Sequence, residues 1–318
     1  MISMDDMRCG LVALVGLPNA GKSTLMNAIV GEKVGIISNK PNTTRITVRG
    51  VLTEGVNQLV FMDTPGWNRS AKAFDRRLVQ QAAGAAAEAD IVAILADIGG
   101  GAAAFGPDVR ELVDQAKQRQ QKVVLVVTKI DKLKSKEALL PLLGKLNDWN
   151  VDAVVPLAAI KADPHDGQAK GANARKVSGV ERLVAELVKL IPDGPWLFPP
   201  EQVTDIPLKL RLAELTREQA MRQLHQELPY QIGVITESVE EVEDDDGNVT
   251  LIHQQLLVSK EQHKPMVLGN RGQMLKKIGT FSRLEMQKVV GERVRLELHV
   301  KVAEKWLERE QWLREMGV

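Results

Sequence analysis

Residues 16–24 have the sequence Gly-Leu-Pro-Asn-Ala-Gly-Lys-Ser-Thr, and the expected organisation of the chain follows from this stretch. Two glycines separated by four residues and followed by Lys and Ser match the phosphate-binding P-loop. The apolar run 11–15 before the motif predicts a buried strand, and the run 25–30 after it predicts a helix. Such a turn points backbone N–H groups at phosphate oxygens, and the helix dipole adds positive potential. Lys22 is expected to reach the β- and γ-phosphates, and the Ser23 hydroxyl to bind Mg²⁺.

The composition limits the possible classes of protein. The 318 residues are enough for about two domains. Lys and Arg number 42 against 41 Asp and Glu, so any nucleic-acid surface must be a local patch. A single cysteine, Cys9, fits a reducing cytoplasm, and the acidic N-terminus predicts no signal peptide. No apolar run approaches the ~20 residues of a transmembrane helix, and only 3% of residues are aromatic, which limits base stacking.

A polar segment after the P-loop helix is suited to a mobile loop. Residues 33–45 are broken by Gly35 and Pro41, which predicts a loop. A Thr hydroxyl in such a loop can bind Mg²⁺ when a γ-phosphate is present. Thr44 is the first choice for this role and Thr43 the second, with ordinary turn chemistry as the alternative.

The next apolar run, 58–62, predicts a second buried strand that ends in Asp63-Thr64-Pro65-Gly66. An acid at the tip of such a strand suits a Mg²⁺ site in which a water lies between the carboxylate and the metal. Gly66 can donate its N–H to a γ-phosphate without a side-chain clash. Alone, these four residues are more often a turn, but their position after a P-loop favours the functional interpretation. The predicted metal set is Ser23, Thr44 and Asp63, and the predicted catalytic set is Lys22, Thr44 and Gly66.

Strands alternate with helices through the rest of the first half. This order predicts an α/β domain with a mainly parallel sheet covered on both faces. The helices are expected at 74–88, 107–121 and 180–191, and the strands at 90–97, 122–127 and 153–159. Residues 161–178 predict a mobile insertion.

The strand 122–127 is followed by Thr128-Lys129-Ile130-Asp131, which suits a guanine site. Asp131 would accept hydrogen bonds from guanine N1–H and the 2-amino group, an edge that adenine lacks. The Lys129 stem would lie along the base, and a backbone N–H at Ala158 or Ala159 would meet guanine O6. The predicted nucleotide-binding set is Asn19, Ala20, Gly21, Lys22, Ser23, Thr24, Asp63, Thr128, Lys129, Asp131, Ala158 and Ala159.

A proline-rich segment separates two predicted domains. Four prolines between 192 and 200 exclude a helix and favour a semi-rigid spacer. The expected limits are 1–191 for the first domain, 192–204 for the linker and 205–318 for the second domain. In the second domain we expect a helix at 208–228 and an antiparallel strand pair at 230–239 and 249–258. The acidic run 240–248 between these strands predicts a solvated hairpin tip, with a cation site as the alternative.

Gly269 and Gly272 have the G-x-x-G spacing of a KH domain, whose loop clamps about four nucleotides of a single strand. An apolar strand precedes this loop, an amphipathic helix follows it, and 293–300 predicts a third strand before a last amphipathic helix at 304–316. Residues 260–295 hold nine basic residues against three acidic ones, a local net charge of +6. The alternative is a merely charged helix face. The predicted RNA-binding set is Gly269, Asn270, Arg271, Gly272, Lys276 and Lys277.

Together these motifs resemble the Era family of GTPases over nearly the whole chain. The resemblance implies a P-loop GTPase domain joined to an α+β type II KH domain. It also implies GTP or GDP with Mg²⁺, and an Asn19 that helps to bind K⁺, with an Asn that only caps the loop as the alternative. Three departures stand out: Thr128 replaces the usual Asn, Ala158 replaces the usual Ser, and Trp67 stands where Ras-type GTPases have a water-orienting Gln, which the Era family also lacks.

The resemblance further implies what the protein does and where. The expected role is a slow GTPase switch that binds single-stranded RNA, at the three-prime end of small-subunit ribosomal RNA, during assembly of the small ribosomal subunit. A cytoplasmic monomer is expected, with weak peripheral association at the inner face of the membrane as a further expectation. The alternative is a non-hydrolysing RNA-binding assembly factor whose nucleotide site has decayed, as Thr128 and Ala158 would suggest.

Overall fold

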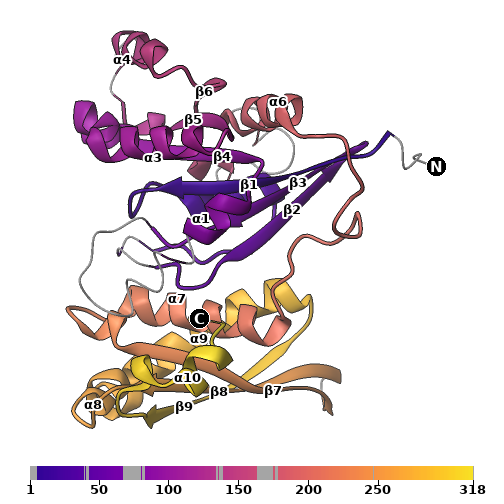
Figure 1. Ribbon diagram of the computed structural model, residues 1–318. Helices are drawn as coiled ribbons and strands as arrows, with labels where there is room; N and C mark the ends of the chain where they lie inside the picture. Colours follow the sequence, from indigo (N-terminus) through magenta and orange to yellow (C-terminus); the bar gives the residue numbers. More distant parts are fainter. Residues whose placement is uncertain are drawn as a thin grey trace. The chain divides into compact units, whose positions relative to one another are not determined.

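The chain forms two compact units, Met1–Asp205 and Ile206–Val318 (Figure 1). The computed structural model describes residues 6–38, 40, 43–66, 80, 83–133, 135, 139–162, 175, 178–245 and 247–317.

The first unit contains a six-stranded sheet in the order β2-β3-β1-β4-β5-β6. β2 runs antiparallel to β3, and the pairings β1–β3, β1–β4, β4–β5 and β5–β6 are parallel. The mainly parallel α/β fold is therefore confirmed. The strands are β1 Arg8–Gly16, β2 Val48–Glu54, β3 Asn57–Asp63, β4 Ile91–Asp97, β5 Lys122–Thr128 and β6 Ala153–Pro156.

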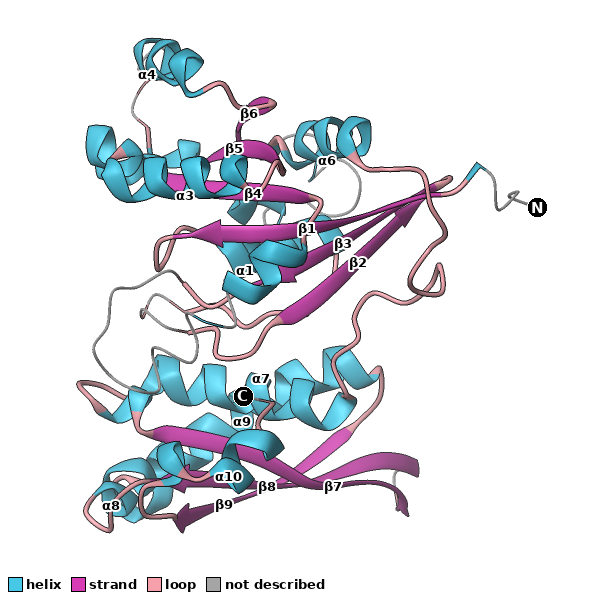
Figure 2. Ribbon diagram, in the orientation of Figure 1, coloured by secondary structure: helices cyan, strands magenta, loops and turns pink. Residues whose placement is uncertain are grey.

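Helices cover both faces of this sheet, because consecutive residues in the middle of β4 and β5 are apolar and buried (Figure 2). α3 and α4 close the core on one face, and α1 and α6 contact each other and the strands on the other. Gly21 and Gly31, both left-handed with φ of 97° and 81°, flank α1 and fix where it begins and ends. The helices are α1 Lys22–Val30, α3 Pro107–Gln118, α4 Leu139–Leu146 and α6 Val180–Leu190.

Two elements of the first unit were not predicted. β2 lies in the alternating sequence after Thr44, and it pairs with β3 through a tight turn at Gly55, where φ is 58°. α4 contains Pro141 and Gly144, which weaken a helical pattern. Of the predicted helix 74–88, residues 83–88 are helical and most of the remainder lies outside the described residues, as does most of the segment 161–178.

Residues 193–205, which we call the strap, are the last residues of the first unit and pack against its sheet. Gln58 is fully buried and holds the strap by hydrogen bonds. Its side-chain oxygen accepts hydrogen bonds from the N–H groups of Leu197 and Phe198 at 2.9 and 3.0 Å. Its amide donates to the Phe198 carbonyl at 2.8 Å. Further along, Val51 donates its N–H to the Val203 carbonyl at 2.9 Å, so the strap follows the outer edge of β2.

The second unit has the order helix–strand–strand–helix–helix–strand that the type II KH pattern predicts. β7 pairs antiparallel with β8, and β8 pairs parallel with β9. The helices α7 and α9 pack on one face of this sheet around Val234, Leu256 and Val258. The elements are α7 Leu208–Gln223, β7 Ile232–Asp244, β8 Gly247–Val258, α8 His263–Leu268, α9 Gln273–Val290, β9 Val294–Val302 and α10 Glu310–Glu315.

Two expectations for the second unit were wrong. Most of the acidic run belongs to the strands rather than to a hairpin tip, because ladder pairing continues from Val239 to Asp244 with the acids facing solvent. The last helix is broken: a 3-10 turn at Trp306–Glu308 precedes α10, and Arg309 is extended between them. The Trp306 side chain is 1% exposed and donates to the Gln231 carbonyl at 3.1 Å, which anchors this break.

Candidate functional site

A cavity of about 420 Å³ opens where β1, β3 and β5 end. Most of the predicted nucleotide-binding residues line it: Asn19, Gly21, Lys22, Ser23, Thr24, Thr128, Lys129, Asp131 and Ala159. Thr44 and Gly66 of the predicted metal and catalytic sets also line it, as does Thr43, the second choice for the Mg²⁺ role. Ala20, Asp63 and Ala158 are buried just behind this lining. The sequence reasoning missed the other lining residues, which are Pro18, Ile36, Ile37, Ser38, Lys132 and Ile160.

The P-loop wraps closely around Lys22. The Lys22 ammonium donates to the carbonyls of Gly16 and Leu17 at 3.1 and 3.3 Å, and the residue is 6% exposed. Burial lowers the pKa of Lys22, and the charge of Asp63 acts in the opposite direction. Gly66 lies directly against this loop, because a Cβ there would stand 3.1 Å from the Pro18 Cα. The segment that ends in Gly66 therefore packs directly against the P-loop at Pro18, with no room for a side chain on residue 66.

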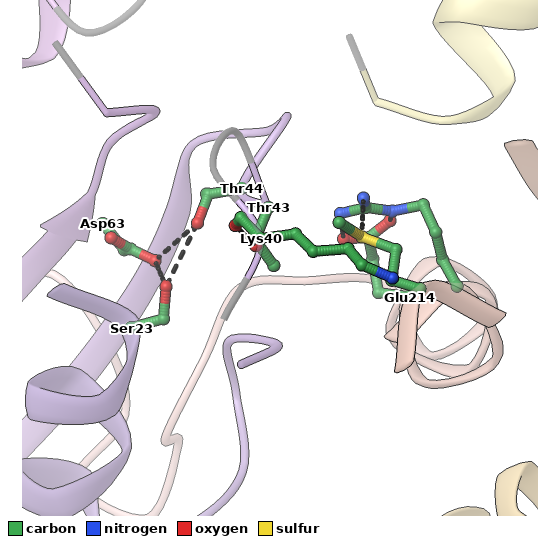
Figure 3. Close-up of polar contacts among 8 residues, drawn as sticks. Ser23, Lys40, Thr43, Thr44, Asp63 and Glu214 are labelled. Carbon is green, nitrogen blue, oxygen red and sulfur yellow. Dashed lines mark hydrogen bonds and ion pairs between the residues drawn. The ribbon is translucent and has the colours of Figure 1, made fainter. Parts of the chain in front are cut away.

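Ser23, Thr44 and Asp63 converge beside the P-loop (Figure 3). The Ser23 hydroxyl lies 2.6 Å from the Asp63 carboxylate and 3.1 Å from the Thr44 hydroxyl, and Thr44 lies 3.4 Å from the same carboxylate oxygen. The Thr43 hydroxyl instead donates to the Lys40 carbonyl at 2.6 Å. The geometry thus favours Thr44 over Thr43.

The Asp63 carboxylate has the environment of a cation ligand. It is fully buried, and its second oxygen has no hydrogen-bond partner among the described residues. Burial raises the pKa of Asp63, while Lys22 and the hydrogen bonds from Ser23 and Thr44 lower it. Two hydroxyls and a carboxylate are hard oxygen donors, which fit Mg²⁺ that keeps waters and phosphate oxygens as its other ligands. Within the described ranges there is no cluster of three or more His, Cys, Asp or Glu side chains that would hold a metal without such help.

The end of β5 supplies the opposite wall. The Thr128 hydroxyl lies 2.8 Å from the Ala20 carbonyl, and the Lys129 ammonium lies 2.6 Å from both the Asn19 carbonyl and the Asp97 carboxylate. Asp131 is exposed in the short 3-10 turn that follows and faces the cavity.

Ala158 and Ala159 differ in position. Ala158 donates its N–H to the Ser178 carbonyl at 2.8 Å, so that group is already engaged within the fold. Ala159 is the one of the two that lines the cavity.

Asn27 is a further functional candidate that the sequence reasoning missed. It lies on α1, is fully buried, and holds the start of the loop that carries Thr44 by three hydrogen bonds to Val34 and Gly35. The available signal was a polar residue inside the apolar run 25–30.

The G-x-x-G segment of the second unit is a tight turn between α8 and α9. Gly269, Arg271 and Gly272 all have positive φ, at 70°, 50° and 77°. A Cβ on Gly269 would lie 2.6 Å from the Met274 Cβ, so this position accepts only glycine. Asn270 and Arg271 are exposed at the tip, as are Lys276 and Lys277 on α9. A short helix, α8, rather than the apolar strand β8, immediately precedes the loop.

A groove of about 380 Å³ continues from this loop between α9 and β9. Its walls combine aliphatic side chains with two cations, and they are Gly272, Leu275, Lys276, Gly279, Thr280, Arg283, Leu296 and Leu298. Such a groove can hold a phosphate backbone and unstacked bases.

A P-loop cavity with a guanine-type Asp, in a chain that also carries a KH unit, defines a GTPase with an RNA-binding domain. Residues 11–129 match the family model of the 50S ribosome-binding GTPase, and residues 227–307 match that of the KH domain. The chain belongs to the GTPase Era family. It is 42% identical over 311 residues to GTPase Era of Dinoroseobacter shibae, covering 98% of this chain and 95% of that protein. It is 40% identical to GTPase Era of Brucella suis, covering 98% and 93% respectively.

Solved structures agree with this family. Aquifex aeolicus Era bound to GDP and AlF4⁻ is 34% identical with a TM-score of 0.86, covering 98% of this chain and 99% of that one. Era in complex with MgGDPNP and nucleotides 1506–1542 of 16S ribosomal RNA matches with the same values. The prediction of an Era-family GTPase with a KH domain is therefore confirmed. In the described part of the chain, no helix has the length and apolarity to cross a bilayer.

Proposed function

We propose that this protein is a Mg²⁺-dependent GTPase that binds the three-prime end of small-subunit ribosomal RNA and acts in assembly of the small ribosomal subunit. The observation that carries the GTPase assignment is the convergence of Ser23, Thr44 and Asp63 beside the buried Lys22. The activity belongs to residues 1–191, and RNA binding to residues 205–318. The family membership of the chain supports both parts.

The residues of the cavity have distinct tasks in this proposal. Lys22 leaves the carbonyls of Gly16 and Leu17 and binds the β- and γ-phosphates. Ser23 and Thr44 would hold Mg²⁺, and Asp63 would accept hydrogen bonds from waters of the ion. Mg²⁺, when bound, neutralises charge that develops on the phosphate oxygens. Gly66 donates its N–H to the γ-phosphate, and Ala159 donates its N–H to guanine O6.

The rate of hydrolysis is expected to be slow without a partner. The residue after Gly66 in the sequence is Trp67 rather than a water-orienting Gln, and Trp67 lies outside the described residues. We assign Asn19 a role in binding K⁺ near the phosphates, where the added positive charge would stabilise the transition state. Potassium then stimulates turnover, and equal rates in sodium and potassium would count against this assignment.

RNA binding is assigned to the loop 269–272 and the groove beside it. The two glycines let a phosphate backbone approach closely, while Arg271, Lys276 and Lys277 supply positive charge. The Era complex with 16S ribosomal RNA supports the choice of RNA. We expect a cytoplasmic monomer, and we retain weak peripheral membrane association as part of the proposal.

The deciding experiment is single-turnover GTP hydrolysis with and without RNA, in Mg²⁺ and in excess chelator. Hydrolysis that requires Mg²⁺ and disappears in Lys22→Ala supports the proposal. Unchanged wild-type turnover in chelator would contradict it. Tight RNA binding with no turnover under any condition would instead favour the alternative, an assembly factor with a decayed nucleotide site. The geometry favours the active enzyme, because Ser23, Thr44 and Asp63 converge beside Lys22 on the phosphate side of the cavity.

A further inference from the structure

The hydroxyl of Thr128 donates its hydrogen bond to the P-loop. Thr128 ends β5, is 2% exposed and lines the cavity. Its oxygen lies 2.8 Å from the Ala20 carbonyl and 3.3 Å from the Ala96 carbonyl. Carbonyl oxygens only accept hydrogen bonds, so the hydroxyl must donate its single proton, and the shorter contact is the one to the P-loop.

This contact sets the direction of one peptide plane. In a trans peptide the C=O and N–H groups point in opposite directions, and the described residues contain no cis bond. Since the Ala20 carbonyl points at Thr128, the N–H of Gly21 in the same peptide points away from Thr128 into the loop. Lys129 holds the preceding carbonyl, that of Asn19, at 2.6 Å. Two side chains at the end of β5, those of Thr128 and Lys129, therefore donate hydrogen bonds to two successive carbonyls of the P-loop.

The same geometry leaves the Thr128 hydroxyl without a proton to donate to the guanine base. The edge of guanine that carries N7 and O6 presents two acceptors. A hydroxyl whose proton is directed at Ala20 has no proton left for N7. An Asn in this position would have two amide protons, enough for a backbone carbonyl and a base nitrogen together.

We propose that Thr128 is a positioning residue that orients the P-loop peptide between Ala20 and Gly21 and does not read the base. This inference rests on the proposed function and sharpens it. Guanine is chosen through Asp131 at the N1 and 2-amino edge, and the N7 position is ignored by residue 128. Replacement of the usual Asn by Thr thus removes one base contact and keeps the support of the phosphate site.

The probe is 7-deaza-GTP, in which a C–H group replaces N7. Equilibrium titrations in Mg²⁺ compare it with GTP for the full chain and for Thr128→Val, Thr128→Ser and Thr128→Asn. The wild type should bind the two nucleotides equally, within about twofold. Thr128→Val has the same shape without the proton, so both nucleotides should bind about five- to tenfold more weakly, by the same factor. Thr128→Ser should restore binding, and Thr128→Asn should introduce a preference for GTP of about fivefold.

The outcomes test separately whether residue 128 reads the base and whether it positions the P-loop. A wild-type preference for GTP of about fivefold or more would overturn the inference, because N7 would then be read. Thr128→Val binding both nucleotides like the wild type would overturn the positioning role. A thermal melt checks folding, and if Thr128→Val melts early the Ser and Asn variants still test base reading. Failure of the folded wild type to bind either nucleotide would contradict the proposed function itself, a result distinct from the others.

Discussion

Asn27 holds Gly35 by hydrogen bonds in both directions. Its amide donates to the Gly35 carbonyl at 2.8 Å, and its oxygen accepts the Gly35 N–H at 2.9 Å. Gly35 in turn abuts the proposed Mg²⁺ site, since a Cβ on it would lie 3.2 Å from the Ser23 Cβ. The start of the loop is therefore fixed to α1, and the cavity wall at Ile36 and Ile37 is built from this fixed point.

Replacement of Asn27 should loosen that wall. Asn27→Ala leaves the buried N–H groups of Val34 and Gly35 without an acceptor, which costs about 2 kcal/mol of the free energy of unfolding. We expect GDP to dissociate about tenfold faster, as measured by stopped-flow release of a fluorescent GDP. Asn248→Ala makes the same chemical change at an exposed position of the second unit and serves as the control. Lower stability with an unchanged release rate would show that Asn27 supports the fold alone.

Selection of guanine should depend on Asp131. Asp131→Asn replaces a pair of acceptors by one acceptor and one donor, which matches the edge of xanthine. The variant should prefer XTP to GTP, with its affinity for GTP reduced about 100-fold or more. Competition titrations measure both, and Asp108→Asn on the exposed first turn of α3 is the matched control. If Asp131→Asn binds GTP as tightly as the wild type, the assignment of Asp131 to the guanine site is wrong.

RNA binding should depend on the tip of the KH loop. Asn270→Asp combined with Arg271→Asp changes the local charge by −3 where the phosphates approach most closely. Affinity for single-stranded RNA should fall by about tenfold or more, and the salt slope should flatten by about one phosphate contact. Polarisation titrations across a salt series measure both quantities.

The control for this loop variant carries the same charge change elsewhere in the unit. Asn248→Asp combined with Arg314→Asp places it at two other exposed positions. GTP binding and the thermal melt should be normal in both double variants. A loop variant that melts normally yet binds RNA like the wild type would falsify the KH assignment.

The reactivity of the single cysteine, Cys9, can show whether the strap is bound to the first unit's sheet or released from it. Cys9 is buried, its sulfur lies 3.8 Å from the Gln58 side-chain oxygen, and burial raises the pKa of the thiol. Gln58→Leu removes the hydrogen bonds that clip Leu197 and Phe198 and should release the strap. Alkylation of native protein at pH 8 should then be about tenfold faster, because the thiol gains access to solvent and loses burial. Burial raises the pKa of Cys9, and this effect is larger than that of the Leu197 backbone hydrogen bond, which lowers it. Mass spectrometry counts the adduct. Gln255→Leu in the second unit should alkylate at the wild-type rate.

The sequence motifs brought most of the predicted nucleotide residues to one cavity, because phosphate binding demands a fixed spacing along the chain. The P-loop joins the end of β1 at Gly16 to the start of α1 at Lys22. Asp63 ends β3 and Asp131 follows β5, and these parallel strands end at the same edge of the sheet. β2 was missed because its apolar and polar residues alternate over a short stretch beside a long polar loop. The choice of Ala159 over Ala158 could not be predicted, since it depends on a hydrogen bond to Ser178, twenty residues further along the chain.

Two other features depend on tertiary contacts that no local pattern reveals. The acidic residues between Val239 and Asp244 belong to β7 because β8 pairs with them, although their composition is that of a turn. Thr128 stands in the sequence only as a replacement for the usual Asn. Its hydroxyl bonds to the carbonyl of Ala20, which lies 108 positions away in the chain.

The strap also has a consequence for the solubility of the first unit. β2 is an outer strand of its sheet, and such a strand presents backbone groups that a neighbouring molecule can pair with. Val203 and Thr204 occupy part of that edge, and Asp205 forms an ion pair with Arg49 at 2.8 Å. A fragment that stops at residue 191 would leave β2 open to strand-to-strand aggregation. A fragment that extends to residue 205 would carry its own protection.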